Sequence, residues 1–268
     1  MLKYVLFTFI LLIGIRSSAQ EYNRFLHKKF EVKQQQKNTT TLFAQGEEIL
    51  FYSDKTIQSF CTVTEVSPKG FQLQINTQSI TGHLNAFGQE QHFSTTDQTT
   101  LAPADSAAIK SLLNKVQLVK VQNHQQLFVS DNNDTSKENL FVVPDDVTKY
   151  FLALPVTALK LGYSWVDSTE MDSSKTVSQY IISKIDADSL QVTVFSTLQQ
   201  RTIVQQKNQQ MIQQLKGYAK AERWYDLKQR ILKQELLNTT FNGMSGINSQ
   251  SLPISIKINT QTFLRPIW

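Results

Sequence analysis

The feature that most constrains the fold of this chain is a strict alternation of apolar and polar residues with a period of two. In the segment FQLQINT, Phe71, Leu73 and Ile75 fall on one side of an extended chain, and glutamine and asparagine fall on the other. The turn-forming SPKG precedes this segment, and the strand-forming SFCTVTEV precedes the turn. Two such segments around a proline and glycine turn are typical of a β-hairpin with one buried and one hydrated face. The pattern therefore predicts a mainly β chain built from antiparallel sheets.

The hairpin pattern returns 119 positions later, in QYIISKI, DADS and LQVTVFS at residues 179–196. Similarity at a fixed offset indicates a repeated structural unit. The shift aligns five pairs of apolar residues: Val63 with Ile182, Val66 with Ile185, Phe71 with Leu190, Leu73 with Val192, and Ile75 with Val194. Upstream, Gly46 and Gly162 each open a strand-like segment, and they align with a slip of three residues.

The repeat predicts two similar halves, residues 20–143 and 144–268, that together form a partial barrel or a sandwich. Eight apolar residues of the two hairpins are expected to be buried: Val63, Phe71, Leu73, Ile75, Ile182, Leu190, Val192 and Val194. Trp165 is expected to fill the space between the halves. Its expected neighbours are Leu154, Val156 and Leu159. The alternative is that Trp165 lines the mouth of a ligand site.

One or two short helices are expected between the strands. The segment PADSAAIKSLLNKV, residues 103–116, has apolar residues at helical spacing and Asp105 or Ser106 as its N-cap. The segment PDDVTKYFLAL can form a short helix that begins at Pro144. Between these two, LVKVQNHQQLFVSD predicts a further hairpin that turns at the Asn-His pair at 123–124.

The segment 199–240 fits two interpretations. Its content of glutamine, lysine and leucine favours a helix by intrinsic propensity. The alternation of the surrounding sequence favours strands, with Ala219, Ala221 and Tyr225 on one side and a turn near residues 226–229. We expect strands, because tertiary context often overrides propensity.

The N-terminus has the pattern of a secretory signal peptide, residues 1–19. Lys3 precedes an unbroken apolar run, and the small residues Ser-Ser-Ala place the cleavage site between Ala19 and Gln20. The apolar run is shorter than the roughly 20 residues that a membrane-spanning helix needs. We therefore expect export to the periplasm, the outer membrane or the medium, with no transmembrane segment after cleavage. The alternative is a retained N-terminal anchor.

The charge of the exported chain is mild. Removal of residues 1–19 takes away Lys3 and Arg16, which lowers the formal net charge from +5 to +3. Such a chain lacks the concentrated basic surface of a nucleic-acid-binding protein, so nucleic acid is excluded as a partner. The single Cys61 cannot form an internal disulfide, and its strand-like surroundings favour a buried, unreactive thiol.

Several short segments resemble a family of secreted bacterial β-proteins, the domain of unknown function 6263. They are GEEIL, VTEVSPKGFQLQI, LPVTALKLGYSW and YDLKQRIL. The resemblance covers most of the mature chain and rests on structural motifs, with the centre around Leu154-Pro155 and Gly162-Tyr163-Ser164-Trp165 carrying most of it. The sequence departs from the family pattern at Asn123-His124 and Lys228-Gln229, where Asp-Gly type turns are expected. The resemblance implies a β architecture and an exported location, and it implies no catalytic residue.

Aromatic residues near a run of cations form one candidate surface for a partner or ligand. Tyr218, Trp224 and Tyr225 lie among six basic residues: Lys216, Lys220, Arg223, Lys228, Arg230 and Lys233. In an exported chain such charges are typical of a solvated strand face whose lysines deter edge-to-edge pairing. Trp165 completes this candidate set.

Two histidines could face one another across a predicted hairpin. His83 and His92 bracket LNAFGQEQ, with a turn expected at residues 87–88. Together with Glu90 or Asp97 they would supply the imidazole and carboxylate ligands of a zinc site. The alternative is two surface histidines, because two ligands do not complete a site, so no metal is assigned.

No motif in the sequence indicates catalysis. A Gly-rich phosphate loop, a G-x-S-x-G elbow, HExxH and CxxC are all missing. The loop DNNDTSKEN lacks the glycine of a calcium loop, and Val142 stands where its last acid belongs. We therefore predict no catalytic residue and no cofactor.

Three functional hypotheses follow. The first is a non-catalytic binding module whose curled sheet holds an apolar ligand, such as a lipid, or a component of the cell envelope. The second is a structural or interaction protein without a ligand pocket. The third is a hydrolase of envelope polymers, which requires two carboxylates converging in a cleft. A cavity of about 300 Å³ or more would favour the first.

The signal-peptide prediction can be checked by mass spectrometry of the exported protein. The first residue is expected to be Gln20, either free or cyclised. A mature species that still begins at Met1 or Lys3 would contradict it.

Overall fold

The structure, a computed structural model, describes residues 23–67, 70–97, 116–122, 125–129, 146–152, 159–171, 174–206, 209–247 and 250–267, with the single residues 100, 110, 113 and 154. The elements are β1 (Lys29–Ala44), β2 (Glu47–Ser67), β3 (Gly70–Ala86), β4 (Gln89–Ser94), β5 (Val116–Gln122), β6 (Gln125–Val129), the 3-10 helix η1 (Val147–Tyr150), β7 (Ser164–Met171), β8 (Ser174–Ile185), β9 (Ser189–Gln206), β10 (Gln209–Asp226), β11 (Ile231–Ile247) and β12 (Gln250–Pro266).

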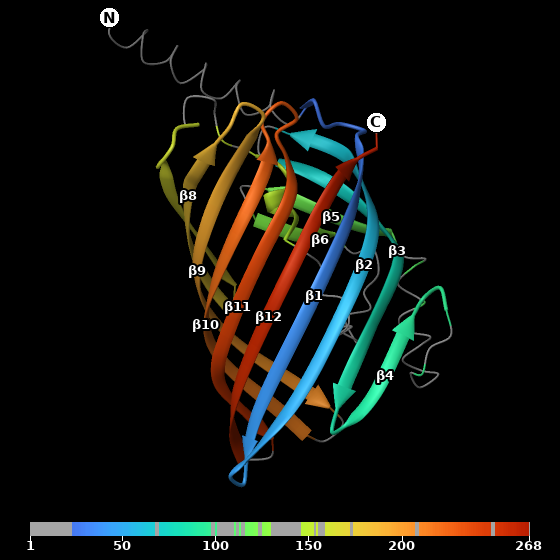
Figure 1. Ribbon diagram of the computed structural model, residues 1–268, viewed down its shortest axis with the longest axis vertical. Coiled ribbons are helices and arrows are strands. Elements are labelled where there is room, and N and C mark those ends of the chain that lie inside the picture. Colours follow the sequence, from blue (N-terminus) through green and yellow to red (C-terminus); the bar gives the residue numbers. More distant parts are fainter. Residues whose placement is uncertain are drawn as a thin grey trace, which may run out of the picture.

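The strands form one antiparallel sheet in the order β6-β5-β3-β2-β1-β12-β11-β10-β9-β8-β7, and β4 pairs with the far half of β3. This confirms the prediction of a mainly β, antiparallel fold. The strand path has two ends, β6 and β7, so the described sheet is open. Figure 1 shows the far ends of β9 and β10 passing behind the strands at the front, so the sheet curls strongly. Of the two arrangements expected, the single curled sheet corresponds to the partial barrel.

The two predicted hairpins are present, and their registers match at the offset of the sequence repeat. β2 and β3 place Val63 opposite Leu73, and a β-bulge follows immediately. β8 and β9 place Ile182 opposite Val192, and a β-bulge follows at the corresponding position. Alternation alone does not produce a bulge, which is a specific local feature. The matching bulges therefore support a structural repeat.

A side-chain hydrogen bond recurs at each bulge. The Thr64 hydroxyl donates to the carbonyl oxygen of Gln72 at 3.4 Å. The Ser183 hydroxyl donates to the carbonyl oxygen of Gln191 at 3.3 Å. These four residues align in pairs at the same offset as the hairpins.

The residues before the first strand of each half also correspond, and they correct one alignment. His27 has a φ of 61°, and its backbone N–H donates to Val63 at 2.8 Å just before β1 begins. Gly162 has a φ of 78°, and its N–H donates to Ile182 at 2.9 Å just before β7 begins. The counterpart of Gly162 is therefore His27, whereas Gly46 occupies the turn between β1 and β2. It follows that β1–β2–β3 corresponds to β7–β8–β9.

The expected core residues of the hairpins lie together in one hydrophobic core. Seven of them are buried: Val63, Phe71, Leu73, Ile182, Leu190, Val192 and Val194. The eighth, Ile75, is partly buried and packs against the same core. Cys61 is buried there, as expected, and as the single cysteine of the chain it forms no internal disulfide.

One short segment covers the face of the sheet that carries this core. We call that face the inner face and the segment, residues 147–152, the inner segment. The Phe151 ring centroid lies 4.4 Å from that of Phe25 and 4.8 Å from that of Phe71. The backbone N–H of Leu152 donates to the turn before β11 at 2.9 Å. The inner segment thus contacts strands of both halves.

The expected short helices are described only in part. The helix expected from Pro144 is present as η1, one 3-10 turn whose N-cap Asp146 accepts a hydrogen bond from the backbone N–H of Thr148 at 3.0 Å. In the expected helix 103–116, Lys110 and Leu113 are helical and the end belongs to β5, while the other positions lie outside the described residues.

The segment 199–240 is strand, as predicted. It contains the end of β9, all of β10 and most of β11, with the turn between Asp226 and Ile231. Ala219, Ala221 and Tyr225 are buried on the inner face. The hairpin that turns at 123–124 is also present, as β5 and β6.

Glycines allow aromatic rings to lie flat against the inner face of the curled sheet. Gly217 stands opposite Phe241, and a Cβ at this glycine would lie 2.6 Å from the Phe241 ring and 2.3 Å from the Thr240 carbonyl oxygen. Gly82 stands opposite Phe93 in the same way. An aromatic side chain that packs over a glycine of the neighbouring strand helps to fix the register of the two strands where the sheet is curved.

Among the described residues, no helix has the length and apolar character needed to cross a membrane. The predicted signal peptide, residues 1–19, lies outside the described residues.

The core assignment predicts a large loss of stability on Leu190→Ala. Leu190 is fully buried, so the substitution should lower the free energy of unfolding by about 2 to 5 kcal/mol in chemical denaturation. The control is Leu50→Ala, at a leucine that is 58% exposed, where a change within about 0.5 kcal/mol is expected. Equal effects of the two substitutions would show that the second hairpin is not part of the core.

Candidate functional site

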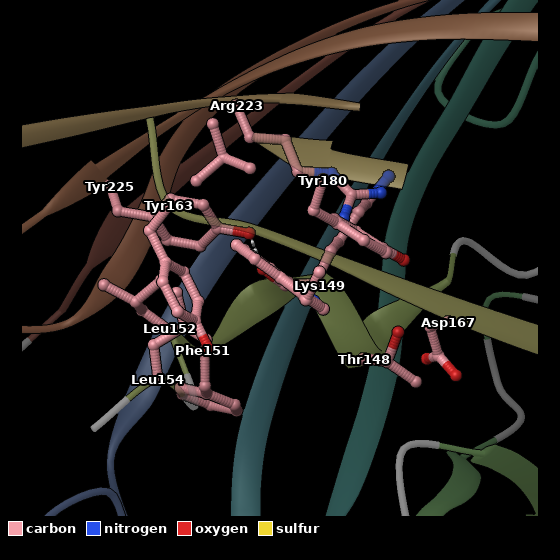
Figure 2. Close-up of a pocket in the computed structure, with 12 residues that line it drawn as sticks. Thr148, Lys149, Phe151, Leu152, Leu154, Tyr163, Asp167, Tyr180, Arg223 and Tyr225 are labelled. Carbon is pink, nitrogen blue, oxygen red and sulfur yellow. Dashed lines mark hydrogen bonds between the residues drawn. The ribbon is translucent and has the colours of Figure 1, made fainter. Parts of the chain in front are cut away.

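A cavity of about 280 Å³ lies between the inner segment and the inner face of β7 to β10 (Figure 2). Its lining combines aliphatic, aromatic and charged residues: Thr148, Lys149, Phe151, Leu152, Leu154, Tyr163, Trp165, Asp167, Tyr180, Val192, Arg223 and Tyr225. The lining residues that come from the sheet lie close together because directly opposite residues on neighbouring strands point to the same face of the sheet. Trp165 stands opposite Tyr180, and Arg223 stands opposite Val192.

Aromatic rings form one wall of the cavity. The Trp165 and Tyr180 rings are stacked, with centroids 4.8 Å apart and an interplanar angle of 5°. Tyr163 extends this wall, with its ring centroid 5.9 Å from that of Trp165. Because β7 is at the end of the strand order, Trp165 is only partly buried. The wall is a flat apolar surface that an acyl chain or a ring can contact.

A buried ion cluster forms the floor of the site. Glu235 on β11 is fully buried and accepts a hydrogen bond from Arg223 Nε on β10 at 2.8 Å. Its other carboxylate oxygen contacts the Lys149 ammonium of the inner segment. Two cations thus share one buried anion. A buried charge is stable only when it is paired and hydrogen-bonded.

The cluster shifts the acid–base properties of its members. Burial raises the pKa of Glu235, but the adjacent Lys149 and Arg223 lower it more, so that the pKa falls to about 2. Burial lowers the pKa of Arg223, and the Glu235 carboxylate outweighs this and raises it above its usual value. Burial raises the pKa of Tyr225 to about 12, and its neutral hydroxyl donates to the Lys149 carbonyl oxygen at 3.0 Å. All three groups therefore keep their usual charge at neutral pH.

The first half of the repeat has no cation at the position equivalent to Arg223. Leu73 in the first hairpin faces Val119 on β5, which is fully buried. Its counterpart Val192 in the second hairpin faces Arg223 on β10. A strand position that is an ordinary core valine in one half is therefore a buried cation in the other.

Trp165 also occupies a core position of the repeat. In the first half, Phe30 stands opposite Cys61 and is fully buried. In the second half, Trp165 stands opposite Tyr180, the residue that aligns with Cys61. β1 is flanked by β2 and β12, whereas β7 pairs only with β8 in the described sheet. The missing neighbour opens the Trp165 side of the core to the cavity.

Arg223 retains hydrogen-bond donors for a ligand. Its guanidinium carbon lies 5.8 Å from the centroid of the Tyr180 ring, and its side chain is 13% exposed. Among the described residues, Glu235 is the one acceptor that its side chain reaches. A guanidinium has five N–H donors, so the terminal nitrogens keep four for an anionic group. Figure 2 shows Tyr180 and Arg223 on one side of the site and Phe151, Leu152 and Leu154 on another.

The structure separates the four residues of the predicted partner or ligand surface. Trp165 and Tyr225 line the cavity. Tyr218 and Trp224 lie on the opposite face of the sheet, which we call the outer face, and Tyr218 is 63% exposed. Side chains alternate between the two faces along β10, and Tyr225 is on the inner face. Of the expected neighbours of Trp165, Leu154 lines the same cavity and Leu159 packs against the core, while Val156 lies outside the described residues.

Sequence reasoning missed the charged members of the site. Arg223 was grouped with the solvated cations, yet it shares its strand face with Ala219, Ala221 and Tyr225. Its position within that apolar stripe was the available signal. Nothing local to the sequence indicated that Lys149, 74 residues before Arg223, would meet the same carboxylate.

The predicted histidine pair is present on a different part of the sheet. His83 and His92 face one another across β3 and β4, with ring centroids 4.7 Å apart. Glu90 joins them, whereas Asp97 accepts a hydrogen bond from Ser94 at 3.5 Å. The DNNDTSKEN loop lies outside the described residues.

Comparison with known proteins assigns no family. No family model matches the chain, and no curated protein matches it. A structure on lipid–protein interactions in lipovitellin has 8% sequence identity and a TM-score of 0.49, and the match covers 90% of this chain but only 25% of that chain. An outer membrane channel from Pseudomonas putida F1 has 10% identity and a TM-score of 0.27, covering 90% and 96% of the two chains. Pseudomonas aeruginosa OccK7 (OpdD) has 7% identity and a TM-score of 0.25, covering 90% and 100%. All three TM-scores are below 0.5, so nothing about these proteins is transferred to this chain.

The ion cluster predicts a pH-dependent effect of Glu235→Gln. At pH 7 the substitution leaves Lys149 and Arg223 without their anion, and the free energy of unfolding should fall by about 3 to 5 kcal/mol. The pKa of Glu235 is depressed from 4.5 to about 2 in the folded state, so its contribution is present above pH 4.5 and is lost as the pH falls toward 2. The difference between the two proteins should therefore shrink in denaturation curves recorded at successively lower pH.

The matched control is Glu31→Gln. Glu31 pairs with Arg265, whose side chain is 78% exposed, so this substitution should cost less than about 1 kcal/mol. A Glu235→Gln effect as small as that of Glu31→Gln at pH 7 would contradict the buried cluster.

Proposed function

We propose that the protein is a non-catalytic binding protein for an amphiphile, with an acyl or other apolar part against the cavity walls and an anionic head at Arg223. The observation that carries this proposal is the position of Arg223. A cation stands in the wall of an aromatic and aliphatic cavity, at a strand position where the other half of the repeat has a buried valine. A buried charge with a strongly perturbed pKa in a cleft is characteristic of functional sites.

The size of the cavity limits what it encloses. Its volume of about 280 Å³ is close to the lower end of the ~300–1,000 Å³ range of ligand sites. It corresponds to the volume of roughly nine water molecules. The site therefore suits a head group with the first part of a chain, rather than a whole two-chain lipid.

The inner face next to the cavity provides an apolar surface for the rest of the ligand's acyl chain. Beyond the cavity it carries partly buried apolar side chains in the cross-strand rows of β9 to β12: Leu198, Phe241, Ile256 and Ile258. Apolar contact with these residues would add affinity with each methylene buried, at about 0.8 kcal/mol.

The polar groups of the cavity favour binding over hydrolysis. Hydrolysis of a glycosidic bond needs two carboxylates flanking the bond. Among the described residues that line the cavity, Asp167 is the one carboxylate, and the nearby Glu235 is engaged by two cations. Asp167 is exposed at the edge of the site, where it could meet a cationic part of a zwitterionic head group.

The predicted export of the chain narrows the ligand class. If residues 1–19 direct export, the amphiphiles that the protein meets are lipids, lipid fragments or fatty acids of the cell envelope. This part of the proposal depends on the signal peptide, whereas the binding chemistry depends on the cavity alone.

Calorimetric titration with ten-carbon amphiphiles tests the proposal. Decanoate, decyl phosphate and decanol share one chain and differ in the head, and each is used below its micelle-forming concentration. Decanoate and decyl phosphate should bind about 10- to 100-fold more tightly than decanol, because hydrogen bonds to a charged group contribute about 1.5 to 3 kcal/mol. Comparison of the two anions distinguishes a carboxylate ligand from a phosphate ligand.

Arg223→Val, which copies the first half of the repeat, should abolish this preference and leave decanol binding within about twofold. The Lys149–Glu235 pair remains in this variant, and a thermal melt checks that it is folded. Arg265→Gln is the matched control, since Arg265 is exposed and lies outside the cavity. Saturable binding of none of the three probes would overturn the proposal in favour of a structural protein. Equal binding of all three would refute the role of Arg223.

A further inference from the structure

The hairpin formed by β3 and β4 brings two histidines together on the outer face of the sheet. Its turn contains Phe87 and Gly88, with φ angles of 53° and 74°. Two positive φ angles are characteristic of the tight type I′ turn, which fixes the register of the strands that it joins. That register places His83 directly opposite His92. The juxtaposition of the two histidines is therefore set by the backbone of the hairpin.

A carboxylate completes the group. Glu90 is two residues from His92 on the same strand, so both side chains point to the same face. The Glu90 Oε2 atom lies 3.8 Å from His83 Nε2. One ligand atom from each of the three residues can be chosen so that all lie within 4.8 Å of one another.

Neighbouring groups hold these ligands in place. The Asn85 side-chain amide donates to the other carboxylate oxygen of Glu90 at 3.4 Å, which leaves Oε2 directed toward His83. On the far side, the Thr100 hydroxyl accepts from the backbone N–H of His92 at 2.6 Å, and the Thr100 N–H donates back to the His92 carbonyl at 2.9 Å. Metal sites depend on such outer contacts to orient their ligands.

The electrostatic surroundings also favour a cation. The Nε2 atom of His83 is buried and has no hydrogen-bond partner among the described residues. An unsatisfied buried nitrogen is costly, and coordination would satisfy it. Asp54 on β2 stands opposite His83 on its other side, which adds a second negative charge near the imidazoles.

We propose that His83, Glu90 and His92 bind a divalent transition-metal ion, for which zinc is the best chemical match. Two imidazoles and one carboxylate form a known zinc ligand set, and three protein ligands leave a fourth position for water or for a group of a partner. The metal would join β3 to β4 beyond their backbone hydrogen bonds. This site is on the face opposite to the cavity and is independent of the amphiphile site.

Titration of the untagged mature chain with zinc chloride, followed by calorimetry, tests the site. One zinc ion per chain is expected, and zinc should raise the melting temperature. His92→Ala, at an exposed side chain, should weaken zinc binding at least tenfold and remove the zinc-dependent rise in melting temperature, while the metal-free melt stays close to that of the parent protein. Glu90→Gln should give a smaller loss of affinity.

The matched control is His27→Asn, an exposed histidine elsewhere in the chain whose positive φ an asparagine tolerates. It should bind zinc as the parent protein does. Substitution of zinc by cobalt(II) gives a second readout, since a tetrahedral site with nitrogen and oxygen ligands develops visible absorption that His92→Ala should lack. Zinc binding that is absent in the parent protein, or unchanged in His92→Ala, would overturn the proposal.

Discussion

The structure depends on covering the apolar inner face of a single curled sheet. A sheet with one hydrophobic face must bury it against another layer. Here six residues of the inner segment do much of this, because Phe151 packs on aromatic side chains of the first half and pairs with Ile231 of the second. The curl brings the strands of both halves close enough for one short segment to reach them. The two halves thus share one hydrophobic core.

The same segment links the core to the candidate site. Lys149 lies between the buried Val147 and Phe151, so the residue that pairs with Glu235 is fixed by hydrophobic packing on both sides. Glu235 in turn fixes Arg223 in the cavity wall. Any ligand held by Arg223 would therefore stabilise the packing of the inner segment, because binding to the folded state raises its stability. Binding of such a ligand would be coupled to folding through the Glu235 carboxylate.

Local pattern was sufficient to predict the strands, and tertiary contact was needed to predict the site. Alternation correctly identified both hairpins and the core residues in them, since a period of two is a property of the strand itself. It also favoured strands in 199–240 against helix propensity. The cavity was not predictable, because Arg223 and Glu235 are cross-strand partners on β10 and β11, whereas Lys149 reaches Glu235 only when the inner segment packs on the sheet. The alignment of Gly46 with Gly162 failed because a glycine marks any tight turn, whereas the hydrogen bonds of His27 and Gly162 to equivalent residues identify the true counterpart.

The matched bulges allow the two three-stranded units to be compared position by position. Two copies of one three-stranded unit stand in different surroundings: the first is enclosed by neighbours, and the second ends at an open edge. The enclosed copy keeps an ordinary hydrophobic interior and so preserves the fold. The edge copy instead has a buried arginine, stacked aromatic rings and a cavity around its hairpin. Each departure of the second unit from an ordinary hydrophobic core, such as Arg223 where the first unit has Val119, can therefore be identified by comparison with the first unit.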